Sequence, residues 1–207
     1  MKSKFITIEG TEGVGKSTNV AFVREWISAR QIPLVVTREP GGTPLAEEIR
    51  GMLLSRREEL MNPTAELLLA FAARAQHLDK VIKPALAEGK WVLSDRFTDS
   101  TYAYQGAGRG LDKDLILTLE NIVQGDLRPD LTILLDIDVS IGLERARQRG
   151  ELDRFEVETI AFFEKVRAGY HERVSADPDR FAIIDVSVPL ENVKQQIHAV
   201  LKRHLVF

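Results

Sequence analysis

The chain has 207 residues, of which 44% are hydrophobic and 29% charged, a composition typical of a globular protein that buries a sizeable core. Its 28 basic and 31 acidic residues leave a net charge of −3, so no overall field favours nucleic acid or an anionic membrane as a partner. The lack of cysteine excludes disulfides, a thiolate zinc site and a cysteine nucleophile, and the four scattered histidines form no spaced metal-ligand pair.

Short apolar segments alternate along the chain with longer amphipathic ones. The predicted strands cover residues 5–9, 34–37, 91–94, 131–137 and 181–184. The predicted helices cover residues 16–30, 44–54, 63–87, 112–124, 139–149, 156–176 and 190–204. Asn62 followed by Pro63 is a typical helix start. The alternation predicts an α/β fold in three layers, with a five-stranded parallel sheet covered by helices on both faces.

The chain has no internal repeat and no linker rich in proline or glycine. We therefore expect one domain over residues 1–207. The apolar runs at 5–8 and 67–73 are too short for a signal-peptide core or a membrane span. We expect a cytoplasmic location and no membrane partner.

A glycine-rich loop follows the first predicted strand and leads into the first predicted helix, as the pattern G-x-x-x-x-G-K-[ST] requires. The loop and the next helical residue are Gly10, Thr11, Glu12, Gly13, Val14, Gly15, Lys16, Ser17 and Thr18. Glycines let backbone amides turn toward phosphate oxygens, and the helix N-terminus attracts the same anion. We expect Lys16 to reach the β- and γ-phosphates of ATP and the Ser17 hydroxyl to bind Mg²⁺.

This loop alone does not distinguish kinases from GTPases or other ATPases. The chain contains no N-K-x-D segment that would select guanine, which disfavours a GTPase. Its third predicted strand is followed by Asp95 and Arg96 rather than by adjacent acidic residues. An aspartate followed by arginine indicates a site that holds a metal and a second anion.

Arginines occur where predicted strands end. Arg38 and Arg96 follow the second and third strands, and the carboxyl ends of parallel strands border the ligand crevice. Two guanidinium groups can hold one phosphate, and Asp95 would hold the Mg²⁺ shell through water. Arg74, on the predicted helix 63–87, is a third candidate. One such arginine alone would be read as a solvated surface cation, but three together favour a second phosphate site.

Two later segments have unusual composition. Residues 105–110 contain three glycines, which predicts a close-fitting turn or a flexible loop. Beyond the fourth strand the chain is rich in arginine, at Arg145, Arg147, Arg149 and Arg154. Two alternatives stay open for this segment, a solvated helix end or a lid over about residues 142–155 that closes on ATP.

Taken together, these motifs resemble those of the bacterial thymidylate kinases from end to end. The matching segments are residues 10–17, 38–43 (REPGGT), 71–74 (FAAR), 95–97 (DRF), 100–106 (STYAYQG), 125–131 (GDLRPDL) and 145–154. The resemblance implies a P-loop NTPase fold with a short arginine-rich lid. It also implies transfer of the γ-phosphoryl group of ATP to thymidine monophosphate with Mg²⁺, a homodimer built on helix faces, and a cis peptide between Glu39 and Pro40.

The same resemblance assigns roles to residues that would bind the acceptor. Glu12 would contact the 3′-hydroxyl of the deoxyribose, while Arg38 and Arg96 would clamp the monophosphate. Tyr104 would pack against the sugar and crowd out a ribose 2′-hydroxyl.

Further residues would read the base. Arg74, Thr101 and Gln105 would contact the thymine edge. In some relatives an aromatic side chain stacks on thymine four residues before the arginine, where this chain has Ala70. Phe71, one residue later, is therefore either a stacking residue or a core residue on the helix face that it shares with residue 67.

For catalysis, the resemblance implies an in-line transfer in which Lys16, Asp95 with its metal, Arg96 and a lid arginine offset the developing charge. Arg149 is the first choice among the lid arginines, and residues 185–189 would edge the adenine. Two alternative functions remain open from the residues alone. One is a kinase for another small acceptor, and the other is an ATP-dependent switch, which would not need a second set of arginines.

Overall fold

The computed structural model describes residues 2–148, 154–155 and 158–204. Its central sheet has five parallel strands in the order β2-β3-β1-β4-β5. They are β1 (Phe5–Glu9), β2 (Leu34–Arg38), β3 (Trp91–Asp95), β4 (Leu131–Asp136) and β5 (Phe181–Asp185). Each strand lies within one residue of its predicted bounds, so the predicted five-stranded parallel sheet is confirmed.

Each predicted helix has a counterpart in the structure, in the predicted order, but the helical segment over residues 98–108 was not predicted. The helices are α1 (Lys16–Ser28), α2 (Pro44–Leu54), α3 (Pro63–His77), α4 (Lys83–Ala87), α5 (Thr98–Thr101), α6 (Lys113–Gln124), α7 (Val139–Arg147), α8 (Ile160–Ala176) and α9 (Leu190–His204). Two π-helical turns, η1 (Leu78–Ile82) and η2 (Tyr102–Gly108), extend α3 and α5. Asn62 caps α3 as predicted, because its side chain accepts hydrogen bonds from the backbone of Thr64 and Ala65.

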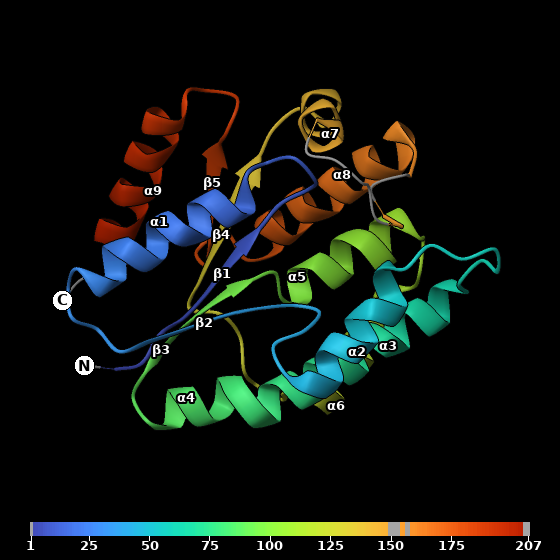
Figure 1. Ribbon diagram of the computed structural model, residues 1–207, viewed down its shortest axis with the longest axis horizontal. Helices are drawn as coiled ribbons and strands as arrows, with labels where there is room; N and C mark the ends of the chain where they lie inside the picture. The colour runs from blue at the N-terminus through green and yellow to red at the C-terminus, as the bar shows by residue number, and fades with distance from the viewer. Residues whose placement is uncertain (1, 149–153, 156–157, 205–207) are drawn as a thin grey trace.

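Helices cover both faces of the sheet, as Figure 1 shows. Because side chains alternate along a strand, Ile6 and Ile8 of β1 pack into the core beneath α1 and α9. Phe5 faces the other way and packs with Leu78 and Ile82 of η1. On that second face α8 covers β4 and β5 with an aromatic cluster. The three-layer arrangement is therefore the predicted one.

The predicted turn or flexible loop at residues 105–110 is wrong for residues 105–108, and the chain turns only at residues 109–110. α5 and η2 form one continuous helical segment that ends only at Gly108. The small residues serve close packing instead, because a Cβ at Gly108 would lie 2.7 Å from the Phe162 ring in α8. A Cβ at Gly169 of α8 would likewise lie 2.7 Å from the Cβ of Ala107. Glycine here brings two helical segments together and does not bend the chain.

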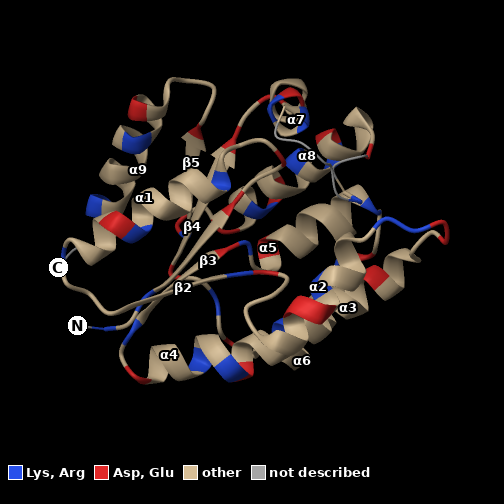
Figure 2. Ribbon diagram, viewed as in Figure 1, with Lys and Arg blue, Asp and Glu red and all other residues tan. Residues whose placement is uncertain are grey.

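No helix in the described part of the chain combines the length and the apolar content that a membrane span requires. Both signs of charge are spread over the helices, as Figure 2 shows. Any strong local field must therefore come from a small group of residues, and the carboxyl edge of the sheet supplies such a group.

Candidate active site

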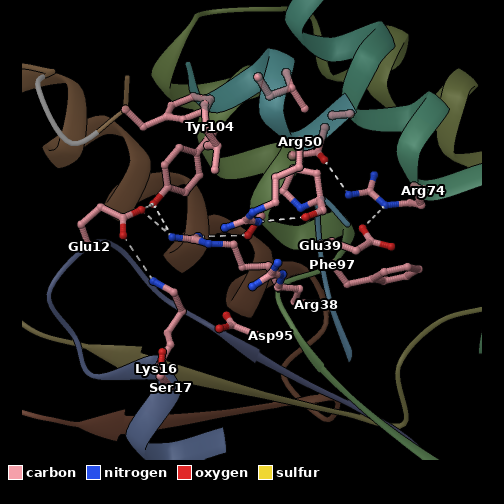
Figure 3. A pocket seen from close by; sticks show the side chains of 18 of the residues that line it. Glu12, Lys16, Ser17, Arg38, Glu39, Arg50, Arg74, Asp95, Phe97 and Tyr104 are labelled. Atoms are coloured by element: carbon pink, nitrogen blue, oxygen red, sulfur yellow. Dashed lines mark hydrogen bonds and ion pairs between the residues drawn. The ribbon is translucent and has the colours of Figure 1, made fainter. Parts of the chain in front are cut away.

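A cavity of about 480 Å³ opens at the carboxyl ends of β1, β2 and β3 (Figure 3). The parallel register places Arg38 of β2 beside Asp95 of β3. The predicted site residues that line the cavity are Glu12, Gly13, Gly15, Lys16, Ser17, Thr18, Arg38, Arg74, Asp95, Arg96, Thr101, Tyr104 and Gln105. The predicted phosphate loop and the strand-end arginines thus share one cavity.

The phosphate loop depends on glycine geometry. Its left-handed residues are Gly10, Gly13 and Gly15, with φ of 143°, 73° and 82°. At Gly13 a Cβ would lie 1.8 Å from the carbonyl oxygen of Gly142, so the loop can pack on α7 only with glycine there. Lys16 is held at the centre of the loop, where its Nζ donates to the backbone oxygens of Gly10 (3.2 Å) and Thr11 (2.8 Å).

Not every loop side chain faces the cavity. Gly10, Thr11 and Val14 do not line it, and Val14 is a core residue with 2% of its surface exposed. These residues shape the loop through their backbone. The side chain of Lys16 is 12% exposed, and desolvation first, then the nearby charge of Arg96, lowers the pKa of its ammonium group.

Glu12 joins the phosphate loop to the arginine site. Its carboxylate lies 3.7 Å from the Lys16 Nζ and accepts hydrogen bonds from Arg96 Nη2 (2.6 Å) and the Tyr104 hydroxyl (2.9 Å). Figure 3 shows Glu12 between Lys16 and Tyr104. One carboxylate therefore fixes the relative positions of two cations from different elements.

Arg96 is the most constrained cation of the site. Its backbone adopts a left-handed φ of 70°, which is uncommon for a residue with a side chain. The guanidinium donates to the Tyr170 hydroxyl (3.0 Å) and Ser100 Oγ (3.2 Å), and lies 4.8 Å from the centre of the Tyr104 ring. Burial lowers its pKa, but Tyr104 and Glu12 outweigh that effect and raise the pKa well above its usual value. Arg96 is a fixed cation.

Arg38 lies at the cavity edge with about half of its side chain exposed. Its Nη2 donates to Glu47 Oε2 of α2 at 2.9 Å, and Glu47 also accepts from the backbone of Gly42. Arg50 of α2 lines the same cavity and donates to the Pro40 carbonyl at 2.8 Å. Sequence reasoning missed Arg50, because an arginine within a helix carries no signal unless its neighbours in space are known.

Arg74 is buried, with 3% of its side chain exposed. Its Nε donates to Glu39 Oε2 (2.7 Å) and its Nη2 to Thr101 Oγ1 (3.0 Å). Glu39 is held in turn by His77 and begins the cis peptide with Pro40 that the resemblance implies. Arg74 Nη1 is buried and has no hydrogen-bond partner among the described residues, so one donor is left over beside the cavity.

Phe71 is not where a base-stacking residue would be. It belongs to a buried cluster with Leu67 and lies beneath the Arg74 guanidinium, 4.8 Å from the ring centre. Ala70, one residue earlier, lines the cavity, as does Phe97 after β3. Helical spacing explains this, because consecutive residues are about 100° apart around a helix, so residues 70 and 71 lie on opposite sides of the line through residues 67 and 74. Of the two alternatives for Phe71, the structure favours the core residue.

Two side chains at the phosphate loop carry oxygen atoms that could bind a metal ion. Ser17 is exposed at the start of α1, and Asp95 follows Ser94 at the end of β3. Asp95 Oδ1 is buried and accepts no hydrogen bond from the described residues. Figure 3 shows Asp95 between Lys16 and Arg38. Within the described ranges no group of three or more histidine, aspartate and glutamate side chains could hold a metal without help from a ligand.

The predicted lid arginines go to different places. Arg145 of α7 donates to the Val186 carbonyl at 3.1 Å, and Arg147 is exposed. Arg154 donates to Leu53 O (2.7 Å) and Glu66 Oε2 (2.8 Å). None of these three lines the cavity. Arg149, the predicted catalytic lid residue, lies outside the described residues.

Glu9 was not predicted as a site residue. It ends β1 beneath Arg96, fully buried, and accepts from the Phe97 amide (2.7 Å), Ser100 Oγ (2.6 Å) and the Tyr170 hydroxyl (2.9 Å). Burial first, and then repulsion from Asp99, raises the pKa of Glu9 to about 7. Its position at the end of an apolar strand was the available signal, but that position alone does not show whether the side chain is buried.

Comparisons with known proteins point to the same family over nearly the whole chain. A family model described as thymidylate kinase matches residues 8–197. A thymidylate kinase of Teredinibacter turnerae is 58% identical over 205 residues, covering 99% of this chain and 100% of that protein. One of Pseudomonas fluorescens is 58% identical over 201 residues, with 97% and 96% covered. The crystal structure of thymidylate kinase from Ehrlichia chaffeensis superposes with a TM-score of 0.80 at 33% identity, covering 97% of this chain and 100% of that one.

Proposed function

The chain belongs to the thymidylate kinase family, and on this premise we propose that its single cavity holds ATP and thymidine monophosphate with their phosphates face to face. The reaction is the ATP-dependent phosphorylation of thymidine monophosphate to the diphosphate. The observation that carries the proposal is that the phosphate loop, Arg38 and Arg96 line one cavity. A switch protein that binds one nucleotide would not need the second set of guanidinium groups.

The donor occupies the phosphate loop. The backbone amides of residues 10–17 and the N-terminus of α1 bind the phosphates, and Lys16 contacts the β- and γ-phosphates from the loop centre. Residues 185–189 edge the adenine. The hydrogen bond from Arg145 to Val186 supports this placement, because it joins that loop to the helix that leads into the lid.

The acceptor phosphate lies between Arg38 and Arg96, and its deoxyribose contacts Glu12 and Tyr104. Arg38 can leave its exposed pair with Glu47 at little cost, because such pairs contribute about 1 kcal/mol or less. Arg96 cannot move in the same way, since Glu12, Ser100 and two tyrosines hold it. Arg96 therefore orients the phosphate and Arg38 closes on it.

The base lies toward Arg74, Thr101 and Gln105. The unpaired Nη1 of Arg74 is a donor for a base carbonyl, and the Gln105 amide can meet the neighbouring ring nitrogen. Phe97 and Ala70 line the wall of the same cavity. This gives thymine one donor and one acceptor on its hydrogen-bonding edge.

The side-chain oxygens of Ser17 and Asp95 are suitable ligands for Mg²⁺. This ion usually takes one or two protein oxygens and completes its shell with phosphates and water, which matches Ser17 Oγ and the unpaired Asp95 Oδ1. When bound with ATP, Mg²⁺ offsets charge on the transferring group. Lys16 and Arg96 offset the remainder from opposite sides. The attacking phosphate oxygen is already ionised, so no side chain has to act as general base.

Larger features complete the proposal. Residues 1–207 form one kinase domain whose lid spans about residues 142–155, and Arg149 bridges the phosphates when the lid closes. The ion pair of Arg154 with Glu66 suits a tether at the end of the lid. The enzyme acts in the cytoplasm, where ATP is available, as a homodimer joined through helix faces.

Separate binding measurements test this division of the cavity. Lys16→Ala should lower turnover by roughly a hundredfold or more, as loss of a donor to transition-state charge does, while thymidine monophosphate still binds. Arg38→Ala should weaken binding of thymidine monophosphate by about tenfold and leave binding of a non-hydrolysable ATP analogue unchanged. Calorimetric titration with each nucleotide and steady-state assays give both results. Near-normal turnover of Lys16→Ala, or donor binding lost in Arg38→Ala, would refute the assignment.

A further inference from the structure

Glu66 is a fully buried carboxylate whose only role above is its ion pair with Arg154. It lies in the first turn of α3, where the helix N-terminus favours negative charge. Its Oε2 pairs with Arg154 at 2.8 Å and with Arg109 at 3.3 Å. Its Oε1 accepts from Gln105 Nε2 at 2.7 Å. A base-reading side chain is thus hydrogen-bonded to a buried acid from another element.

The contact decides which way the Gln105 amide points. A side-chain amide has one donor end and one acceptor end, and the two can be exchanged by a half turn. A carboxylate has acceptors only, so Glu66 can bind only the NH₂ end. Gln105 is 6% exposed and lines the cavity, so its carbonyl oxygen is the atom left for a ligand.

The resulting pattern distinguishes bases. The Gln105 carbonyl, an acceptor, and Arg74 Nη1, a donor, belong to side chains that line the same cavity. Thymine presents an N3–H donor beside its O4 acceptor and matches both. Cytosine presents N3 as an acceptor beside an amino donor and matches neither. If the amide were reversed, the site would place two donors side by side and would no longer reject cytosine at N3.

We propose that Glu66 is a positioning residue for base specificity, which acts by holding the Gln105 carboxamide in the orientation that accepts a hydrogen bond from the pyrimidine N3–H. The inference rests on the proposed role of Gln105 in reading the base. Arg109 and Arg154 hold the Glu66 carboxylate in place, and Arg109 is itself paired with Glu158.

The test compares two acceptors that differ only at the edge in question. Thymidine monophosphate and 5-methyldeoxycytidine monophosphate share the sugar, the phosphate and the 5-methyl group. In Glu66→Gln the new amide can donate to the Gln105 carbonyl, so the carboxamide can turn over. The ratio of kcat/KM for the two acceptors should fall by about tenfold to a hundredfold, which is the usual cost of an unmatched polar group.

Arg109→Gln is the matched control, because it removes a partner of Glu66 but leaves the contact with Gln105. Its activity can fall, yet its ratio should stay within about threefold of the parent value. A preserved ratio in Glu66→Gln, with a lowered ratio in Gln105→Ala, would overturn the inference alone. An unchanged ratio in Gln105→Ala would overturn the proposed role of Gln105 as well.

The positioning role of Glu66 can be tested even if the Glu66→Gln variant folds poorly. If thermal unfolding shows that Glu66→Gln is unfolded at the assay temperature, the double variant Glu66→Gln/Arg109→Gln restores the local charge balance. The same ratio is then measured against Arg109→Gln as the parent. A fall supports the positioning role, and an unchanged ratio overturns it.

Discussion

At the scale of single residues, Glu9 is a carboxyl group placed where burial makes its ionisation unfavourable. Three donors hold its carboxylate, from the turn between β3 and α5, from α5 and from α8, and the last of these, Tyr170, is 161 residues away along the chain. Nevertheless its pKa lies near 7, because burial and Asp99 outweigh Arg96 and these hydrogen bonds. The ionised form is therefore destabilising, and it persists because Glu9 orients Ser100 and Tyr170, which in turn hold Arg96.

A prediction about pH follows from this residue. Between pH 4.5 and about 7 the folded state binds more protons at Glu9 than the unfolded state does, so stability falls as pH rises through this window. A shift of this size corresponds to roughly 3 kcal/mol. Glu9→Gln lacks this group, so its free energy of unfolding relative to the parent should rise by up to about that amount from pH 4.5 to 8.

Urea unfolding of both proteins across this range measures the difference. Titration of every other group is shared by the two proteins and cancels to first order. Asp99 shifts in the opposite direction, since its pKa is lowered by its arginines despite burial, and it titrates below the window. A difference that does not change with pH would contradict the assignment.

Some residues of the site could be predicted from the sequence and others could not. Arg38 and Arg96 could be placed because each follows a strand, and parallel strands end at one edge. Glu66 and Arg50 could not, because their roles depend on partners that only the folded chain brings near, such as Gln105 for Glu66. Phe71 shows a subtler limit, since a shift of one position on a helix separates a core residue from a cavity residue.

At the scale of elements, the contact between α8 and η2 holds the acceptor side of the cavity together. The hydroxyls of Tyr170 in α8 and Tyr104 in η2 both accept hydrogen bonds from Arg96. They donate in turn to Glu9 and Glu12, respectively. Close approach of the two helical segments depends on Gly169, where a Cβ would meet Ala107 Cβ at 2.7 Å and Ala103 Cα at 3.0 Å. The backbone atom cannot move aside without shifting η2.

Gly169→Ala should therefore destabilise the protein by about 1–3 kcal/mol, as an added methyl group in a packed interface does, despite the higher helix propensity of alanine. Gly51→Ala in α2 is the matched control. A Cβ there meets nothing within 4 Å, so the change should stabilise by about 0.5–1 kcal/mol. Urea unfolding of both variants provides the comparison. Equal effects of the two substitutions would show that the glycine in α8 is not a packing requirement.

The element boundaries were predictable where local signals existed. Asn62 and Pro63 identify the start of α3, and apolar runs identify every strand. Residues 105–108 misled the prediction, because glycines within a helix look the same in sequence as glycines in a turn. What distinguishes them is Phe162 and Val166 on the facing helix, which local sequence does not reveal.

At the scale of the whole molecule, the sequence predicted the layers but not the strand order. The order β2-β3-β1-β4-β5 puts β1 at the centre, with β3 and β4 beside it. This order brings the phosphate loop after β1 next to Asp95 and Arg96 after β3, and Arg38 follows on the next strand. The crevice is therefore a consequence of which strands are neighbours, a property that the alternation of elements does not determine.

The proposed homodimer belongs to this scale, and exposed apolar side chains suggest where it forms. One group of them lies on α2, α3 and α6, which are adjacent in Figure 1, and includes Leu45, Met52, Leu68, Leu115 and Ile122. Leu115 and Ile122 are seven residues apart and so share one face of α6. Ile122 is 74% exposed within the chain, an unusual exposure for a large apolar side chain.

Ile122→Lys should therefore weaken self-association, because it would place a charge in an apolar interface without a partner. We expect the parent chain to sediment at twice its monomer mass at micromolar concentration, and the variant to need at least about tenfold more protein to reach the same dimer fraction. Ile141→Lys on α7 is the control, since Ile141 is also exposed but lies outside this surface. Sedimentation equilibrium measures all three proteins. A monomeric parent chain would contradict the proposed homodimer. If both lysine variants dimerise as the parent chain does, the interface does not lie on these three helices.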